Sequence, residues 1–345
     1  MSRPLRISYL VEDTELSGGI RVQLMQADAL VARGHQVRMV TKGLPLTWRS
    51  CDAEWAYVDN FYNYDAGGDD FVIGTFWLTL QPAWEIARER AVHLCQGYEG
   101  FIGAYTDVVD KIENAYRLPL PKLVVAKSLI EVCKRFSDDV TYVGQIVEEE
   151  FFREQTPREN DPPRVLVCGQ SQADFRGIDD AYGAVAHARW FHQKLDLIRV
   201  SAWAPSKAEP LDAVQEFHVA LNTHEMTRLM HSCDALIAAN HAAEGFGLPA
   251  AEALASRIPA ILTSIPSYLS FDDAHDYALF APPENPVELG ERLMELLGDG
   301  DLRERIRARG REVAEQWHAD LVAERMERFF YERLGLHEGI TGPHR

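Results

Sequence analysis

The sequence predicts an α/β protein in which two doubly wound domains face each other. Short apolar strands alternate with amphipathic helices in two successive series, and a charged, proline-rich stretch at residues 148–163 separates the series. Alternating strands and helices form βαβ units, which build parallel sheets covered by helices. A chain of 345 residues is also long enough for two domains of ordinary size. We therefore expect one domain at residues 1–150 and a second at 151–316.

The first series begins with a strand, a loop and a helix. Residues 5–11 form an apolar run with β-branched side chains, which is typical of a buried strand. Gly18 and Gly19 then precede a helical pattern in which Ile20, Leu24, Ala27 and Val31 share one face, and Gly34 ends it. The remaining elements expected in this half are strands at residues 36–41, 71–73, 91–94, 123–126 and 141–143, and a helix at 128–136.

The second series repeats the pattern after the linker. Its apolar runs predict strands at residues 164–168, 197–200, 216–220, 235–239 and 260–263. Between them, helices are expected at residues 178–194, 224–232 and 248–256. The tail, residues 287–334, is rich in arginine and glutamate and is expected to be mostly helical.

Charge and cysteine content narrow the possible functions. The chain has 53 acidic and 35 basic residues, a formal net charge of -18, so nucleic-acid binding is not expected, and no basic face favours membrane association. The N-terminus lacks a signal-peptide pattern, and apolar stretches such as residues 71–84 fall short of the ~18 residues of a membrane span. Five widely spaced cysteines without a CxxC pair favour a cytoplasmic location.

The most informative segment is residues 244–252, EGFGLPAAE. Glu244 and Glu252 bracket a glycine-containing turn, and Pro249 suits the first turn of a helix. Backbone N–H groups at a helix N-terminus bind anions or sugar oxygens, and carboxylates accept hydrogen bonds from sugar hydroxyls. The same pattern also fits a capped loop with two surface glutamates, and the residues alone leave both interpretations open.

This segment resembles the E-x7-E motif of retaining glycosyltransferases of family 4, which have the GT-B fold. The resemblance extends along nearly the whole chain, in the order expected for that family. It includes Gly18–Gly19 with Arg21, ARGHQVRMVT at residues 32–41, KSLIEVCKRF at 127–136, VLVCG at 165–169 with Arg176 and Gly177, and the block at 226–263.

The resemblance implies a GT-B fold, with two Rossmann-like domains facing across a cleft. Residues 1–150 would lie on the acceptor side, and residues 151–316 would bind the nucleotide sugar. The last helix, at about residues 317–345, would cross back onto the first domain.

Roles for individual residues follow from the same resemblance. Glu244 would contact the donor sugar and Glu252 the nucleotide ribose. Arg176 matches a family lysine and would stabilise charge on the departing diphosphate. The remaining expected contacts are Gly18 and Gly19, which allow close approach to the diphosphate, and the backbone of Phe246, Gly247 and Leu248, which would bind sugar hydroxyls or phosphate.

Two positions depart from the family pattern. Gln170 stands where the family usually has arginine, so one positive charge is missing or is supplied by Arg21 or Arg199. The family often has a histidine near the donor sugar, and the segment AVHLCQGYE offers His93 and Gln96. We expect Gln96 to face the site and His93 to lie within the strand.

The implied reaction is transfer of a hexosyl or deoxyhexosyl group from a nucleotide-diphosphate sugar to a hydroxyl, with retention and without a metal or other cofactor. The leaving diphosphate would take the acceptor proton. The acidic chain favours a soluble acceptor, and a natural product such as an antibiotic oligosaccharide is the acceptor we favour. A cell-surface polysaccharide intermediate is the alternative.

The sequence also permits functions of other classes. The segment GQSQA at residues 169–173 comes close to the G-x-S-x-G motif, so a hydrolase built on Ser171 is one alternative. A catalytically silent nucleotide-sugar binder is another, because Gln170 replaces the usual arginine. A nicotinamide site is disfavoured, since the first loop lacks G-x-G-x-x-G and the second strand ends in Thr41–Lys42 without an acidic residue.

Two metal-like motifs are also expected to be structural. HEMTR at residues 224–228 has Arg228 where a zinc site needs its second histidine. The D-x-D pattern at residues 299–301 falls between two expected helices, where a turn is the simpler interpretation.

Overall fold

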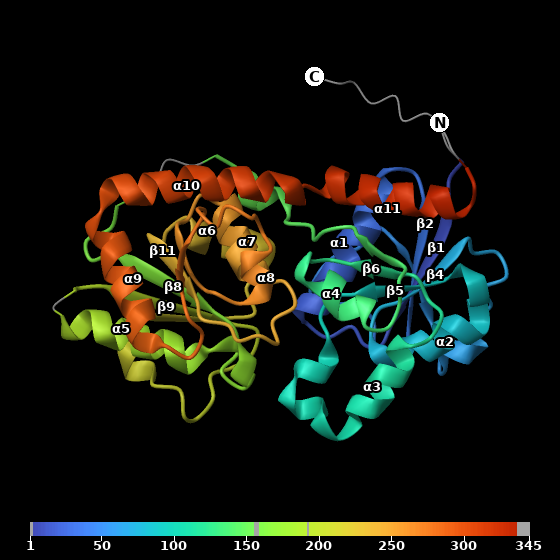
Figure 1. The fold of residues 1–345 in the computed structure, drawn as a ribbon, viewed down its shortest axis with the longest axis horizontal. Helices are drawn as coiled ribbons and strands as arrows, with labels where there is room; N and C mark the ends of the chain where they lie inside the picture. The colour runs from blue at the N-terminus through green and yellow to red at the C-terminus, as the bar shows by residue number, and fades with distance from the viewer. Residues whose placement is uncertain (1–2, 155–158, 192, 337–345) are drawn as a thin grey trace.

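The computed structural model describes residues 3–154, 159–191 and 193–336. It contains two parallel sheets, each flanked by helices, which lie side by side in Figure 1. The first sheet has seven strands in the order β3-β2-β1-β4-β5-β6-β7, and the second has six in the order β10-β9-β8-β11-β12-β13. Two parallel sheets in sequence confirm the predicted fold class.

The first sheet comprises β1 (Arg6–Val11), β2 (Gln36–Thr41), β3 (Glu54–Tyr57), β4 (Phe71–Gly74), β5 (Ala91–Cys95), β6 (Lys122–Val124) and β7 (Val140–Tyr142). Its helices are α1 (Gly18–Ala32), α2 (Trp77–Ala87), α3 (Val109–Tyr116) and α4 (Ser128–Lys134). The central strands are buried on both faces, which explains why they read as continuous apolar runs.

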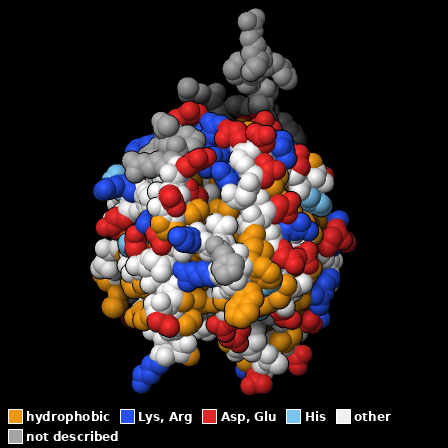
Figure 2. Space-filling model, turned by 90° about the vertical axis from the view of Figure 1, so that its left-hand side faces the viewer, with side chains coloured by type: hydrophobic (Ala, Val, Ile, Leu, Met, Phe, Trp, Pro, Cys, Tyr) orange, Lys and Arg blue, Asp and Glu red, His pale blue; other side chains and the backbone are white. Residues whose placement is uncertain are grey.

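The second sheet comprises β8 (Arg164–Cys168), β9 (Asp196–Ser201), β10 (Glu216–Val219), β11 (Ala235–Ala238), β12 (Ala260–Thr263) and β13 (Leu279–Ala281). Its helices are α5 (Ile178–Trp190), α6 (Thr223–Met230), α7 (Leu248–Ala255), α8 (Pro266–Leu269), α9 (Pro286–Gly298) and α10 (Gly300–Ala314). Figure 2 views this end of the molecule and shows acidic and basic side chains interspersed over the face.

The structure corrects several expected elements. Strands β3 and β13 and helix α2 are absent from the sequence-based prediction. The helix expected at residues 178–194 ends at Trp190. The linker expected at residues 148–163 begins with a 3-10 turn, Glu149–Phe152, in which Phe151 and Phe152 are buried. Residues 155–158 of that linker and residues 337–345 of the expected last helix lie outside the described residues.

The last helix, α11 (Ala319–Arg333), packs on the first domain. Figure 1 shows α10 and α11 running in succession along both domains. The Phe330 ring lies 4.7 Å from the Phe71 ring between centroids, and Glu327 Oε1 lies 2.8 Å from His35 Nε2. Tyr331 donates a hydrogen bond to the carbonyl of Arg3 at 3.0 Å.

The topology places the functional loops. In each sheet the strand order reverses beside the first strand, at β1/β4 and at β8/β11. Ligands of open α/β sheets bind at such switch points, beyond the carboxyl ends of the strands. The loops after β1 and β5 of the first domain meet those after β8 and β11 of the second domain around one cavity.

Candidate functional site

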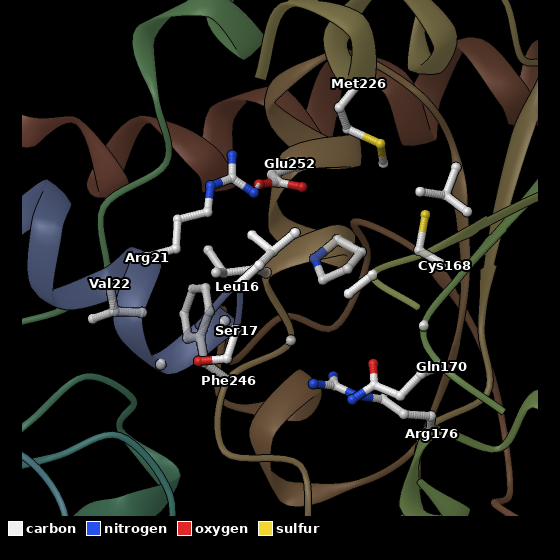
Figure 3. A pocket seen from close by; sticks show the side chains of 18 of the residues that line it. Leu16, Ser17, Arg21, Val22, Cys168, Gln170, Arg176, Met226, Phe246 and Glu252 are labelled. Atoms are coloured by element: carbon white, nitrogen blue, oxygen red, sulfur yellow. Dashed lines mark ion pairs between the residues drawn. The ribbon is translucent and has the colours of Figure 1, made fainter. Parts of the chain in front are cut away.

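A cavity of about 260 Å³ lies between the two domains. Figure 3 shows that its side chains come from α1, from strand-end loops and from α7. Every residue assigned to the site from the sequence lines it: Gly18, Gly19, Gln96, Gln170, Arg176, Glu244, Phe246, Gly247, Leu248 and Glu252. The structure therefore brings together residues from both halves of the chain.

The N-terminus of α1 forms one wall. Ser17 caps the helix, because its hydroxyl accepts a hydrogen bond from the backbone N–H of Ile20 at 3.3 Å. Gly18 and Gly19 form the first turn, and a Cβ at Gly19 would lie 3.6 Å from Gln96 Oε1. The remaining first-turn N–H groups and the positive end of the helix dipole suit an anion.

The turn before α7 forms the opposite wall. Gly247 has φ +91°, and a Cβ there would lie 2.3 Å from the Tyr268 ring, so only glycine fits. Pro249 then occupies the first turn of α7. This turn directs Glu244 into the cavity from the loop and Glu252 from the helix.

Glu244 is held by two partners. Its carboxylate forms an ion pair with Arg176 and accepts a hydrogen bond from Asn240 Nδ2 at 2.6 Å. Tyr268 in turn donates to Asn240 Oδ1 at 2.8 Å, which fixes the orientation of the amide. The Glu244 side chain is 9% exposed, so it is positioned rather than mobile in solvent. Arg176 brings its positive charge directly beside it.

Glu252 is buried more deeply, with 3% of its side chain exposed. Its Oε1 lies 2.8 Å from Arg21 Nη1, an ion pair that crosses from the first domain to the second. Arg21 Nη2 also donates to Glu148 Oε2 at 2.5 Å. Burial raises the pKa of Glu252 to about 7; Arg21 opposes this shift and the Glu148 charge adds to it.

Gln170 stands where the resembled family has an arginine, and Arg21 and Arg199 are the two suggested sources of the missing positive charge. Only one of these two arginines lines the cavity. Arg199 is fully buried, pairs with Glu209 at 2.7 Å and donates to the carbonyl of Val167, so it does not reach the cavity. Arg21 does line the cavity. The suggestion that Arg199 supplies the charge is therefore wrong, because its guanidinium is consumed inside the second domain.

His93 and Gln96 lie in different environments. His93 is buried in β5, its ring edge-on to Tyr116 at 4.6 Å, and burial with nearby Lys122 lowers its pKa well below the usual value. Gln96 lies beyond the end of the strand and donates from Nε2 to the Thr75 carbonyl at 3.5 Å. Its Oε1 is buried without a hydrogen-bond partner among the described residues. Gln96 therefore contributes an amide oxygen that can accept a hydrogen bond to the lining of the cavity.

The competing motifs have structural roles. The hydroxyl of Ser171 donates to Glu209 at 2.7 Å, and no described histidine accepts from it. Asp299 caps α10 by accepting from the Leu302 N–H at 2.9 Å, which accounts for the D-x-D pattern. His224 lies exposed at the start of α6 beside Glu150. Among the described residues, no cluster of three or more His, Cys, Asp or Glu side chains is arranged to hold a metal ion.

Some residues around the site have no sequence signal. Asn240 follows β11 and orients Glu244, but asparagine after a strand is ordinary loop composition. Glu148 accepts a hydrogen bond from Arg21, and the Thr223 hydroxyl donates to the same Glu148 Oε2 at 2.7 Å. These contacts join residues far apart in the sequence and depend on how the two domains pack. Among the described residues, no helix has both the length and the apolar character needed to span a membrane.

Comparison with protein families gives a match within the second half of the chain. Residues 203–313 match the family model described as glycosyl transferases group 1. A comparison with curated sequences gives no significant match.

Solved structures resemble the whole chain at low sequence identity. A glycosyltransferase from Rickettsia africae has TM-score 0.75 and 16% identity, covering 96% of this chain and 99% of its own. Sucrose-phosphate synthase from Thermosynechococcus elongatus has TM-score 0.78 and 14% identity, covering 96% and 100%. Anabaena HepE with UDP-glucose has TM-score 0.77 and 12% identity, covering 95% and 100%. These likenesses show the GT-B fold, and the family match supports a glycosyltransferase.

Proposed function

We propose that the protein is a retaining glycosyltransferase of the family 4 type that transfers a hexosyl or deoxyhexosyl group from a nucleoside-diphosphate sugar to a hydroxyl. The observation that carries this proposal is the placement of Glu244, with Arg176, and Glu252 around one cavity between two Rossmann-like domains. The structure of HepE with UDP-glucose makes UDP the first donor nucleotide to test.

Each wall of the cavity has a part in the proposed reaction. Glu252 binds the ribose hydroxyls, and the N-terminus of α1 with Gly18 and Gly19 receives the diphosphate. Arg176 stabilises the charge that develops on the diphosphate as the glycosidic bond breaks. Glu244 and the backbone of residues 246–248 hold the donor sugar. The Arg176 guanidinium and the N-terminus of α1 thereby supply the positive charge at the diphosphate, and we propose that the reaction proceeds without a metal.

The proposed mechanism is attack from the same face that the leaving group departs from. Both cavity carboxylates are engaged, Glu244 by Arg176 and Asn240, and Glu252 by Arg21. Neither is free to act as a strong base. The departing diphosphate oxygen therefore takes the proton of the acceptor hydroxyl as the new bond forms, and the product keeps the donor's anomeric configuration.

The acceptor is proposed to bind on the first domain beside Gln96. Thr75, whose carbonyl contacts Gln96, is followed by the half-buried rings of Phe76 and Trp77. The Tyr105 ring lies 6.2 Å from Phe76. Aromatic rings of this kind stack on apolar faces of ring-shaped ligands. They support a sugar-containing acceptor. The net charge of -18 favours a soluble one, such as an antibiotic oligosaccharide, with a polysaccharide intermediate as the alternative. The five free cysteines support a cytoplasmic setting.

Nucleotide binding and product analysis test this function. Thermal unfolding is measured with UDP, GDP, dTDP, ADP and NAD, each with and without EDTA. A ligand at 100 times its dissociation constant adds about 2.7 kcal/mol of stability. We expect one nucleoside diphosphate to raise the midpoint in an EDTA-insensitive way, and NMR of the transfer product to show the donor's anomeric configuration.

Several outcomes would contradict the proposal. A shift with NAD alone, or with none of the nucleotides, would show that the cavity is not a nucleoside-diphosphate site. An inverted product would exclude retention. Binding without turnover over a panel of sugar acceptors would favour a nucleotide-sugar binding protein.

A further inference from the structure

We propose that Arg21 is a positioning residue for donor binding: it holds the Glu252 carboxylate ionised and oriented toward the nucleotide, and Glu148 tunes the strength of this hold. The inference rests on the proposed function, because it assigns Glu252 to the donor ribose. It makes donor binding at a site on the second domain depend on a residue of the first domain.

The contacts of Arg21 are divided between two carboxylates. One terminal nitrogen lies 2.8 Å from Glu252 Oε1, and the other donates to Glu148 Oε2 at 2.5 Å. The guanidinium also lies 5.8 Å from the centre of the buried Phe151 ring. Three contacts from two segments, residues 148–151 and α7, fix this side chain, and Figure 3 shows it directed at Glu252.

Glu148 has its own set of partners. The Thr223 hydroxyl donates to its Oε2 at 2.7 Å, and Arg49 Nη2 lies 3.3 Å from its Oε1. Arg49 belongs to the first domain and Thr223 to the second, so Glu148, at the junction between the domains, joins both. The network runs from Arg49 through Glu148 and Arg21 to Glu252, and it ends at the cavity.

Glu252 depends on this network for its charge. The titratable groups facing it are Arg21 from α1, Glu148 from the junction, and the thiol of Cys168 at the end of β8, whose own pKa burial raises. Burial favours the neutral acid, Arg21 favours the carboxylate, and Glu148 disfavours it. With Arg21 on Oε1, the ionised form still has lone pairs on both oxygens to accept from a ribose diol, whereas the neutral acid carries a proton on one oxygen.

The two residues of the network therefore act on donor binding with opposite sign. Replacing Arg21 by glutamine removes the cation, so Glu252 needs a higher pH to ionise. Replacing Glu148 by glutamine removes a competing anion, so Glu252 ionises at a lower pH. A network that merely holds the domains together would weaken binding in both variants without shifting their pH profiles in opposite directions.

The test is the pH profile of nucleotide affinity. Calorimetric titration with UDP is carried out between pH 5.5 and 9 on the full chain and on Arg21→Gln, Arg21→Lys and Glu148→Gln; GDP or ADP, which also carry a ribose diol, replaces UDP if the wild type prefers it. We expect the profile of Arg21→Gln to move up by about one pH unit, about a tenfold loss of affinity on its falling limb. The profile of Glu148→Gln should move down, and that of Arg21→Lys should stay near the wild type.

Two controls isolate the Glu252 contact. The 2′,3′-dideoxy form of the nucleotide carries the same phosphates but no ribose diol, so its profile should not differ between the variants. Arg292→Gln removes a cation that lies outside this network, where it pairs with Glu288 and Glu295 on α9, and its profile should follow the wild type.

The outcomes separate this inference from the function itself. If the wild type binds no nucleoside diphosphate, the proposed function fails. If the wild type binds and the Arg21→Gln and Glu148→Gln profiles are unshifted, or move in the same direction, the inference is overturned while the function stands. If Arg21→Gln does not fold, the sign of the Glu148→Gln shift decides: a downward shift supports the inference and any other result overturns it.

Discussion

The α-carbon of Gly245 in the second domain packs against the backbone carbonyl of Gln96 in the first. A Cβ at Gly245 would lie 2.1 Å from that oxygen and 2.9 Å from the Cα of Gly97. The turn that presents Glu244 thus touches the loop that presents Gln96, backbone against backbone. The two loops can meet in this way only because residue 245 has no side chain.

Gly245→Ala should impair transfer by separating these loops. A displacement of about 1 Å at a reacting centre can cost about 10²-fold in rate, and we expect a loss of that order in kcat/KM. The measurement is a steady-state transfer assay. Gly298→Ala is the matched control, because a Cβ there meets no atom within 4 Å. Equal activity of the two variants would show that the close approach is unimportant.

Glu244→Gln should reduce transfer by about 10²–10³-fold, because it removes a charge that pairs with Arg176 and that, in the proposed reaction, holds the donor sugar. The melting temperature of the variant checks that the fold survives. Ser171→Ala serves as the comparison, since its hydroxyl binds Glu209 and does not line the cavity. Loss of activity in Ser171→Ala with full activity in Glu244→Gln would instead favour the hydrolase.

Glu252→Gln should stabilise the donor-free protein at alkaline pH. Burial raises the pKa of Glu252 to about 7, so the folded state holds a proton that the unfolded state has already released. Stability from this group therefore falls as pH rises from about 4.5 to about 7, and above that the full cost applies. We expect a gain of about 2–3 kcal/mol at pH 8 and little gain at pH 4.5, measured by urea unfolding. A variant less stable than the wild type at pH 8 would contradict this.

Glu327→Gln should loosen α11. Burial alone would raise the pKa of Glu327, but hydrogen bonds from His35 and Arg33 outweigh it and lower the pKa to about 2. The stabilisation is present above about pH 4.5 and is lost as pH falls toward 2. We expect the variant to be about 2 kcal/mol less stable at pH 7, with the difference shrinking by pH 3.

The control for this prediction is Glu324→Gln on the same helix. Glu324 pairs with Arg328 one turn away, and its side chain is 41% exposed. Such pairs contribute about 0.3–0.5 kcal/mol. An equal effect of the two substitutions would show that the contacts of Glu327 with the first domain carry no special weight.

Most of the fold was predictable because buried parallel strands leave continuous apolar runs. Strands β2, β8 and β12 have the predicted bounds. Strand β3 was missed because it is an edge strand whose four residues are only half-buried or exposed. Helix α2 was missed because Pro82 lies inside it, where proline usually argues against a helix.

The part of the site that lies within short sequence motifs was predictable. The turn at residues 244–252 has a composition that indicates its geometry, and Gly247 indeed has a positive φ. The partners of its carboxylates were not predictable. Arg21 meets Glu252 across the domains, and Glu148 meets Arg21 from the junction between them. No periodicity links residues so distant in sequence, so their pairing depends on how the two sheets dock.

The return of α11 to the first domain affects how the chain is made and how it can be re-engineered. Phe330 and Glu327 of α11 complete the packing of the first domain through their contacts with Phe71 and His35. On the ribosome the first domain therefore stays unfinished until α11 has been translated, while the second sheet emerges complete beforehand. A chimaera with exchanged donor specificity should accordingly be spliced at two points, as an internal cassette that leaves α11 with its original N-terminal partner.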